Sequence, residues 1–275
     1  MKPNFLHIGP GRTGSKWLHK VMQAHPEIYV PRIADLYYFD RLENYSKGND
    51  WYLDYFDKVN PAVHKAVGEL SHDYIFSTDA AERISEFNPK MKLLITIRNP
   101  IELAYSQYIS DWNAGTVNIS FEKALKDNPK FVYECSYSNF IPSYTDIFGK
   151  DRIKILEFEM LEKSPPDYIR EITDFLEVSY FSKLSKIKMF NSAAEPRLPG
   201  LGVVAKVFAN QMRFLGLNTF LGVVKSNRLI RSLIFKPHVR QMAINFRHLN
   251  SKYFSKEKDY LEELLQKDLG NWYDD

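Results

Sequence analysis

Residues 5–18 read Phe-Leu-His-Ile-Gly-Pro-Gly-Arg-Thr-Gly-Ser-Lys-Trp-Leu. The stretch Phe5–Ile8 is largely apolar and has the length of a buried strand, and a helical pattern begins at Ser15. A glycine-rich turn from a strand into a helix exposes backbone N–H groups at the positive end of the helix dipole. The stretch therefore predicts a phosphate-binding loop, in which Gly11 and Gly14 let the backbone approach the ligand closely.

Strand and helix patterns alternate along the chain as far as residue 176. Apolar runs recur at Ala66–Leu70, Leu93–Ile97 and Ile153–Phe158, and helical patterns at Ser15–Ala24, Ala80–Phe87, Ile101–Trp112, Tyr137–Phe148 and Pro166–Leu176. This alternation predicts an α/β, P-loop-like three-layer fold with a central, mainly parallel sheet of about five strands and a helical C-terminal elaboration. In such sheets, ligands bind at the carboxyl ends of the strands.

The composition is that of an ordinary globular chain, with 44% hydrophobic and 26% charged residues among 275. Cys135 is the only cysteine, so neither an intrachain disulfide nor a cysteine-rich zinc site can form. The first residues lack the apolar core of a signal peptide, and no run approaches the roughly 18 apolar residues of a membrane span. We therefore expect a cytoplasmic protein.

Positive charge is concentrated in residues 197–258. Twelve basic residues and one acidic residue, Glu257, give this segment a net charge of +11, whereas the whole chain has +3. A basic segment of this size favours an anionic partner: a phosphorylated cofactor, an acidic glycan, an anionic lipid or a nucleic acid. A solvated basic face is the alternative interpretation.

The loop differs from that of nucleotide triphosphatases and kinases. Their pattern places Lys directly after the last glycine, followed by Ser or Thr, whose hydroxyl binds magnesium. Here Ser15 follows Gly14, Lys16 comes one place later, and Trp17 stands where the metal ligand should be. The apolar strand that should end in a magnesium-binding Asp is followed by Arg98-Asn99-Pro100. We therefore expect a phosphate-bearing ligand whose chemistry needs no metal.

The loop resembles the 5′-phosphosulfate loop of sulfotransferases, the enzymes that use 3′-phosphoadenosine 5′-phosphosulfate (PAPS). The residues on its typical pattern, Pro-x-Lys/Arg-x-Gly-Thr-Thr/Arg-x-Leu, are Arg12, Gly14, Ser15, Lys16 and Leu18. The resemblance implies that PAPS is the co-substrate and that its 5′-phosphosulfate is bound by Gly11, Arg12, Thr13, Gly14, Ser15, Lys16 and Trp17. It also implies a catalytic role for Arg12, which stabilises the charge that develops during transfer.

A second anion site is predicted after the strand Leu93–Ile97. Arg98 follows this strand, and Ser106 comes eight residues later in the next predicted helix. The guanidinium supplies charge and two parallel donors and the hydroxyl a third, so both side chains could bind one phosphate. The pair resembles the family's 3′-phosphate site, commonly Arg-Asp/Asn-Pro followed by a serine. In relatives a basic loop also closes over the nucleotide, and Arg197 lies in the corresponding region.

The segment Asp35-Leu36-Tyr37-Tyr38-Phe39-Asp40 resembles the Glu-x-x-Phe-Phe-Asp segment of glycosaminoglycan sulfotransferases. The resemblance implies that Asp35 is the general base that removes the acceptor proton. Aspartate is one methylene shorter than glutamate, so the acceptor must come closer or the loop must shift. Two alternatives stay open. Asp35 caps local structure in one, and in the other His72 is the base, as histidine is in cytosolic small-molecule sulfotransferases.

The resemblance covers most of residues 4–178 and 250–273 and implies a single sulfotransferase domain. Its expected parts are a nucleotide-binding core at 1–190, a helical acceptor-side elaboration at 191–257 and a closing helix at 258–275.

The expected acceptor is a hydroxyl of a saccharide or a glycolipid, with peripheral membrane contact through residues 197–258 and no nucleic-acid partner. Two departures limit what the resemblance implies. Arg12 replaces the family's loop lysine and cannot deliver a proton. Leu70 stands where glycosaminoglycan enzymes usually have Lys, which weakens the case for a heparan-like acceptor. The sequence indicates neither the identity of the acceptor nor the oligomeric state.

Two other functions compete with sulfuryl transfer. A P-loop kinase for a small metabolite would need a magnesium-binding carboxylate near the strand ends, and Asp73 or Glu69 could supply it. A nucleic-acid or membrane-surface binding module would use the basic segment 197–258, in which aromatic residues lie among the charges.

Overall fold

The computed structural model describes residues 2–188, 194–196, 235–237 and 246–272. The chain divides into two compact units. The first comprises Met1–Pro100, Ser136–Phe190 and Ser255–Leu269, and the second comprises Ile101–Cys135, Asn191–Phe254 and Gly270–Asp275.

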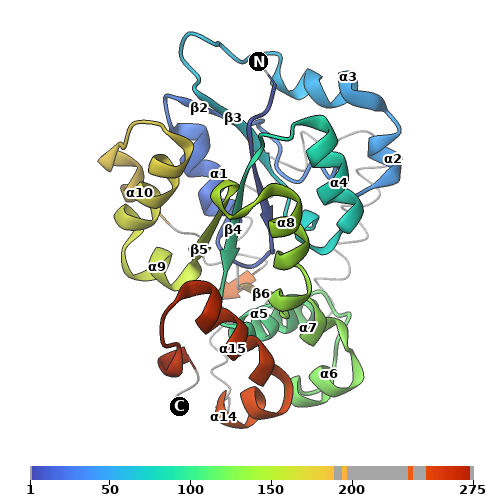
Figure 1. The fold of residues 1–275 in the computed structure, drawn as a ribbon. Coiled ribbons are helices and arrows are strands. Elements are labelled where there is room, and N and C mark those ends of the chain that lie inside the picture. Colours follow the sequence, from blue (N-terminus) through green and yellow to red (C-terminus); the bar gives the residue numbers. More distant parts are fainter. Residues whose placement is uncertain (1, 189–193, 197–234, 238–245, 273–275) are drawn as a thin grey trace. The chain divides into compact units, whose positions relative to one another are not determined.

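A five-stranded parallel sheet forms the centre of the first unit (Figure 1). Its order is β2-β3-β1-β4-β5, and each strand is parallel to its neighbours. All residues of β1 and β3 are buried, as expected for strands covered on both faces. Because β1 lies between β3 and β4, the segments that follow these strands emerge at the same edge. The strands are β1 (Phe5–Gly9), β2 (Ile28–Tyr29), β3 (Ala66–Leu70), β4 (Lys92–Ile97) and β5 (Ile153–Glu157).

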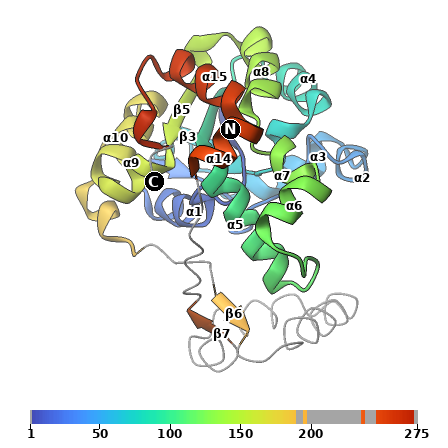
Figure 2. The ribbon, with the colours of Figure 1, turned by 90° about the horizontal axis from the view of Figure 1, so that it is seen from below.

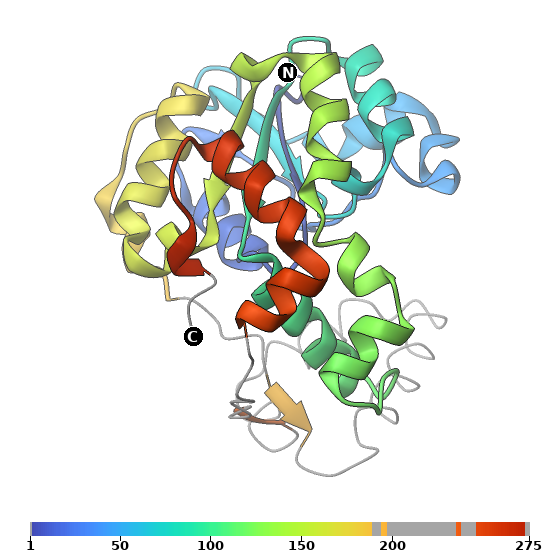
Figure 3. The same ribbon diagram turned by 60° about the horizontal axis from the view of Figure 1, so that its bottom comes forward.

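Helices cover both faces of this sheet. On one face, the buried side chains of α1 (Ser15–Ala24) and α10 (Pro165–Leu176) share a core with residues of β1, β4 and β5. The α1 residues in this core recur at the helical spacing that the sequence pattern predicts: Trp17, Leu18, Val21 and Met22. On the other face, α4 (Thr78–Phe87) packs against α8 (Ile141–Phe148), and the two helices lie side by side in Figures 1 and 3.

Short elements complete the first unit. They are α2 (Leu42–Tyr45), α3 (Gly48–Leu53), η1 (Asp54–Phe56), η2 (Tyr74–Phe76), η3 (Tyr137–Asn139), η4 (Lys150–Arg152), α9 (Phe158–Lys163), η5 (Ser182–Lys186) and α15 (Ser255–Leu265).

The second unit contains α5, which starts at the unit boundary, and the short helices α6 and α7. Aromatic side chains of these two helices pack on α5. The Tyr108 ring of α5 lies 5.3 Å from the Phe121 ring, and its hydroxyl donates to the Ile119 carbonyl at 2.9 Å. Figure 2 shows the antiparallel pair β6 and β7. The elements are α5 (Pro100–Asn113), α6 (Phe121–Asp127), α7 (Lys130–Tyr133), β6 (Ala194–Pro196), β7 (Phe235–Pro237), α14 (Phe246–Leu249), the π-helical η6 (Asn250–Phe254) and η7 (Gly270–Trp272). No helix in the described part of the chain is long and apolar enough to cross a membrane.

The predicted α/β fold with a central parallel sheet is confirmed. One predicted helix, Tyr137–Phe148, is divided into η3 and α8. Pro142 lies in the first turn of α8 and lacks the N–H that a continuous helix would need there. The predicted boundaries of the core, elaboration and closing helix stay a prediction, since most of 191–257 lies outside the described residues.

Candidate active site

The predicted phosphate loop connects β1 to α1 and lies against His72, the second residue after β3. A Cβ added at Gly11 would come within 2.9 Å of Cδ2 of His72, so a larger residue would require the imidazole or the loop to move. Gly14 caps α1 with a φ of +83°, and a Cβ there would come within 2.7 Å of Cδ2 of Leu161. The loop is therefore packed between the β3 side of the sheet and α9.

The N-terminus of α1 is suited to an anion. No side chain caps it, and no acidic residue stands in its first turn. The helix dipole and the orphan N–H groups of the first turn therefore favour negative charge at this point. Arg12 lies in the loop with a φ of +67°, and Lys16 is exposed on the first turn. Two basic residues and the half-buried Ser15 thus accompany the predicted phosphate position.

Two side chains of the predicted loop site are held by hydrogen bonds within the fold. The hydroxyl of Thr13 donates to the Pro10 carbonyl at 2.7 Å, so its proton is not available to a phosphate oxygen. The Trp17 side chain is buried, and its Nε1 donates to the Ile187 carbonyl at 2.7 Å. Its backbone N–H donates to the Gly14 carbonyl. The Trp17 side chain thus packs in the core, and its predicted part in ligand binding stays a prediction.

Arg98 follows β4 and reaches the loop. Its Nη1 donates to the carbonyl oxygen of Arg12 at 3.3 Å, and its Cζ lies 4.5 Å from the centre of the Phe158 ring. The hydroxyl of Tyr137 accepts from the Arg98 N–H at 2.9 Å and donates to the Arg98 carbonyl at 3.0 Å. The backbone at this strand end is thus held on both sides, which orients the guanidinium along the loop.

The other two residues of the predicted nucleotide site stay predictions. Ser106 is half-buried on α5 in the second unit, whereas Arg98 belongs to the first. Arg197 lies outside the described residues.

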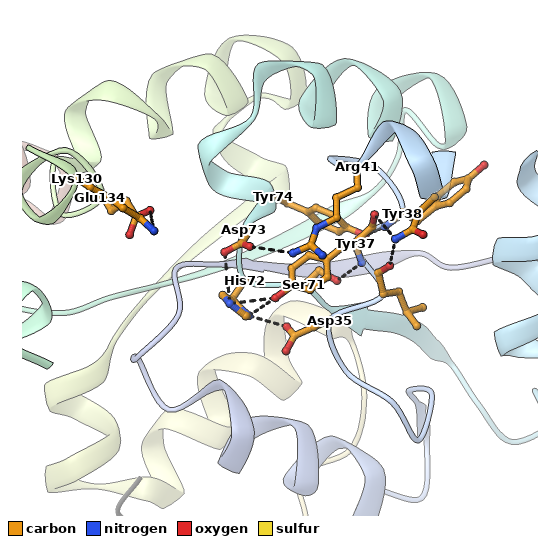
Figure 4. Close-up of polar contacts among 12 residues, drawn as sticks. Asp35, Tyr37, Tyr38, Arg41, Ser71, His72, Asp73, Tyr74, Lys130 and Glu134 are labelled. Atoms are coloured by element: carbon orange, nitrogen blue, oxygen red, sulfur yellow. Dashed lines mark hydrogen bonds and ion pairs between the residues drawn. The ribbon is translucent and has the colours of Figure 1, made fainter. Parts of the chain in front are cut away.

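Asp35 and His72 form a hydrogen-bonded pair (Figure 4). Oδ1 of Asp35 lies 2.6 Å from Nδ1 of His72, and the two side chains are 38% and 32% exposed. Asp35 has a φ of +62° and its N–H donates to the Leu70 carbonyl at 2.8 Å, which fixes the turn beside β3. Burial disfavours the imidazolium, but the hydrogen bond and the charge of Asp35 outweigh it and raise the pKa of His72. The structure thus joins the two alternative bases of the sequence into one pair.

Three further groups surround His72, and the sequence patterns had not indicated two of them. The Tyr37 hydroxyl lies 3.1 Å from Nε2 of His72, and Oδ1 of Asp73 lies 3.4 Å from the same atom. The guanidinium of Arg41 stacks on the Tyr37 ring at 3.7 Å and lies 3.6 Å from Oδ2 of Asp73 (Figure 4). The contacts of Tyr37 with His72 and of Arg41 with Asp73 join residues distant in the sequence, so no local pattern predicts them.

The carboxylates that a kinase would need are engaged within the protein. Glu69 is buried, and its oxygens accept hydrogen bonds from the hydroxyls of Tyr52, Ser71 and Tyr74. Asp73 contacts Arg41 and His72. These contacts favour roles for both carboxylates in organising the site.

Comparisons with known proteins identify the family of this chain. The family model described as "Sulfotransferase domain" matches residues 2–195. The bifunctional heparan sulfate N-deacetylase/N-sulfotransferase 3 of Mus musculus is 27% identical over 208 residues, which are 69% of this chain and 24% of that protein. The membrane-associated sulfotransferase kil1 of Dictyostelium discoideum is 31% identical over 140 residues, 48% of this chain and 29% of that protein.

The chain therefore spans about a quarter of the length of the curated relatives it matches. Among solved structures, a sulfotransferase from Alicyclobacillus acidocaldarius has the same fold, with a TM-score of 0.68, 22% identity and 99% of both chains covered. The family that the sequence resembles is confirmed by this match, which includes the loop after β1. The chain belongs to the sulfotransferase domain family.

Proposed function

We propose that this protein transfers the sulfuryl group of PAPS to a hydroxyl of a saccharide. The observation that carries the proposal is the closeness of Gly11 to His72, which brings the Asp35–His72 pair beside the phosphate loop. A proton acceptor beside an anion-binding loop is the arrangement that group transfer to a hydroxyl requires.

The loop and Arg98 supply the groups that a doubly phosphorylated adenosine needs. The amides at the start of α1 would hold the 5′-phosphosulfate, with Arg12 and Lys16 adding positive charge. Arg98 would hold the 3′-phosphate through its fork of N–H donors. Anchoring both ends of the nucleotide fixes the sulfur in line with the acceptor oxygen.

The reaction balances within this set of groups. The acceptor oxygen forms a bond to sulfur while the bond between sulfur and the 5′-phosphate oxygen breaks, and 3′-phosphoadenosine 5′-phosphate leaves. Arg12 stabilises the charge that develops on the leaving phosphate. The acceptor proton enters the Asp35–His72 pair and rests on His72, because the hydrogen bond and charge of Asp35 raise the pKa of its imidazole against the effect of burial.

A saccharide acceptor is supported by the relatives. The names of several describe heparan sulfate N-sulfotransferases, and the match extends over the segment that contains Asp35. We propose a hydroxyl rather than an amine as the accepting group, on a saccharide that is free or linked to a lipid.

The experiment offers the full chain PAPS with labelled sulfur, or ATP with a labelled γ-phosphate, and saccharides that carry hydroxyls with or without amino groups. We expect label from PAPS on both saccharides and none from ATP, with transfer that survives a chelator. Asp35→Asn should abolish most of the transfer, and Asp79→Asn, at an exposed carboxylate on α4, should leave it unchanged. Label only on the amino saccharide would overturn the hydroxyl assignment, and label only from ATP would overturn the proposal.

A further inference from the structure

A buried carboxylate contacts the residues that hold the segment Asp35–Asp40, called the Asp35 segment below. Glu69 is on β3, its side chain is 1% exposed, and three hydroxyls contact it. Oε1 accepts from Tyr74 at 2.7 Å and from Tyr52 at 3.2 Å, and Oε2 accepts from Ser71 at 2.9 Å. An ionised carboxylate only accepts hydrogen bonds, so each of these hydroxyls has to point its proton at Glu69.

Two of the hydroxyls also accept N–H groups from the Asp35 segment. The Tyr37 N–H donates to Oγ of Ser71 at 3.2 Å, and the Tyr38 N–H donates to the Tyr74 hydroxyl at 2.8 Å (Figure 4). A hydroxyl has one proton, so donation to Glu69 leaves its lone pairs for these amides. Glu69 therefore sets the direction of both relays, from the backbone through a hydroxyl to the carboxylate.

The segment held in this way is strained. Asp35 and Tyr37 have φ values of +62° and +51°, a region that residues with a side chain rarely adopt. Such a conformation persists where its surroundings fix it. Here the Asp35 N–H donates to the Leu70 carbonyl, and the relays hold the residues that follow.

Keeping Glu69 in this place has a cost. Burial raises its pKa to about 7, against the effect of the hydroxyls that bind the ionised form. If this buried position only had to be filled, an apolar residue of similar size would make the protein equally stable or more stable. The carboxylate is better explained by the hydrogen bonds that it directs.

We propose that Glu69 is a positioning residue that acts through Ser71 and Tyr74 to hold the Asp35 segment so that Asp35 meets His72. The inference rests on the proposed function for the use of the pair, but the position of Asp35 can be tested without any reaction.

The matched variants are Tyr74→Phe and Tyr52→Phe. Each removes one hydroxyl from Oε1 of Glu69, but only the Tyr74 hydroxyl also binds amides of the Asp35 segment among the described residues. Ser71→Ala removes the second relay. The first readout is the NMR resonance of the proton between His72 and Asp35 at pH 8, identified by its loss in Asp35→Asn. The second is kcat at saturating PAPS and acceptor.

We expect the resonance to shift or vanish in Tyr74→Phe and Ser71→Ala and to persist in Tyr52→Phe. We also expect kcat to fall at least about tenfold in the two relay variants and less than about twofold in Tyr52→Phe. If Tyr74→Phe does not fold, Ser71→Ala decides the question. An unchanged resonance in the folded relay variants, or an equal loss in Tyr52→Phe, would overturn the inference. Absence of sulfuryl transfer in the wild-type protein would overturn the proposed function and leave the NMR comparison valid.

Discussion

Nη1 of Arg98 donates a hydrogen bond to the carbonyl oxygen of Arg12 at 3.3 Å, so the residue after β4 touches the loop after β1. These residues were predicted to bind opposite ends of one nucleotide. Their contact, within one compact unit, brings both predicted anion sites to the same edge of the sheet. The guanidinium of Arg98 also stacks on Phe158, which limits the directions in which it can point.

Arg12→Ala tests the catalytic role of the loop arginine. We expect kcat to fall by about 100-fold or more, because charge on the leaving phosphate loses a preorganised partner. Arg12→Lys should keep more activity than Arg12→Ala, since lysine keeps the charge but not the fork of donors. The control is Arg152→Ala, whose guanidinium contacts the Lys90 carbonyl on another part of the unit. Turnover equal to that of the control would exclude Arg12 from the chemistry.

Asp35→Asn tests how Asp35 affects the protonation of His72. Neutral His72 accepts the proton, so activity rises with pH through the pKa of its imidazole. Burial lowers that pKa, while the hydrogen bond and charge of Asp35 raise it more. Removing the charge should therefore move the acid limb of kcat/KM to lower pH while the plateau falls. The pH dependence of kcat/KM gives both the position of the acid limb and the height of the plateau. An acid limb that stays in place or moves to higher pH would contradict the proposed effect of Asp35 on His72.

Gly14→Ala and Gly48→Ala separate backbone strain from crowding. Both glycines have a φ of +83°, but a Cβ would be 2.7 Å from Leu161 at Gly14 and within 4 Å of nothing at Gly48. Backbone strain alone should lower the free energy of unfolding by about 1 kcal/mol in Gly48→Ala. In Gly14→Ala, overlap of the new Cβ with Leu161 should lower it by about 2 kcal/mol more. Urea unfolding gives both values. Equal losses would mean that α9 does not confine the loop.

Glu69→Gln should change how stability depends on pH. Burial raises the pKa of Glu69 to about 7 from an ordinary value of 4.5. Between these values the folded state binds a proton that the unfolded state releases, so this contribution to stability falls as pH rises. Relative to the variant, the wild-type protein should lose up to about 3 kcal/mol between pH 5 and pH 8. Parallel stability curves, from urea unfolding at several pH values, would contradict the shifted pKa.

The sequence was sufficient for elements whose signal is local and continuous. The apolar run Leu93–Ile97 identified the central strand β4, and the glycine-rich turn identified the loop before α1. The two-residue strand β2 gave no periodic signal because it is too short to show one. The break between η3 and α8 was missed because the pattern of apolar residues continues across it, although Pro142 marks the new start.

The site was predictable where one motif contains the whole interaction. The local patterns placed the loop after β1 and Arg98 after β4, and their binding of phosphate stays a prediction. The contact between Asp35 and His72 could not be predicted, because the residues are 37 positions apart and the turn that brings them together has a positive φ at Asp35. Directions of side chains were also missed, since spacing alone could not show that Trp17 faces the core and that Thr13 bonds to Pro10.

The central claim is that this chain binds both phosphates of 3′-phosphoadenosine 5′-phosphate. Calorimetry with that nucleotide, ATP and 5′-AMP tests it most directly, in the wild-type protein and in Arg98→Ala. We expect the bisphosphate to bind more tightly than either other nucleotide, and Arg98→Ala to weaken its binding about 10- to 100-fold while leaving the affinity for 5′-AMP unchanged. Preference for ATP, or equal binding of the bisphosphate by both proteins, would contradict it.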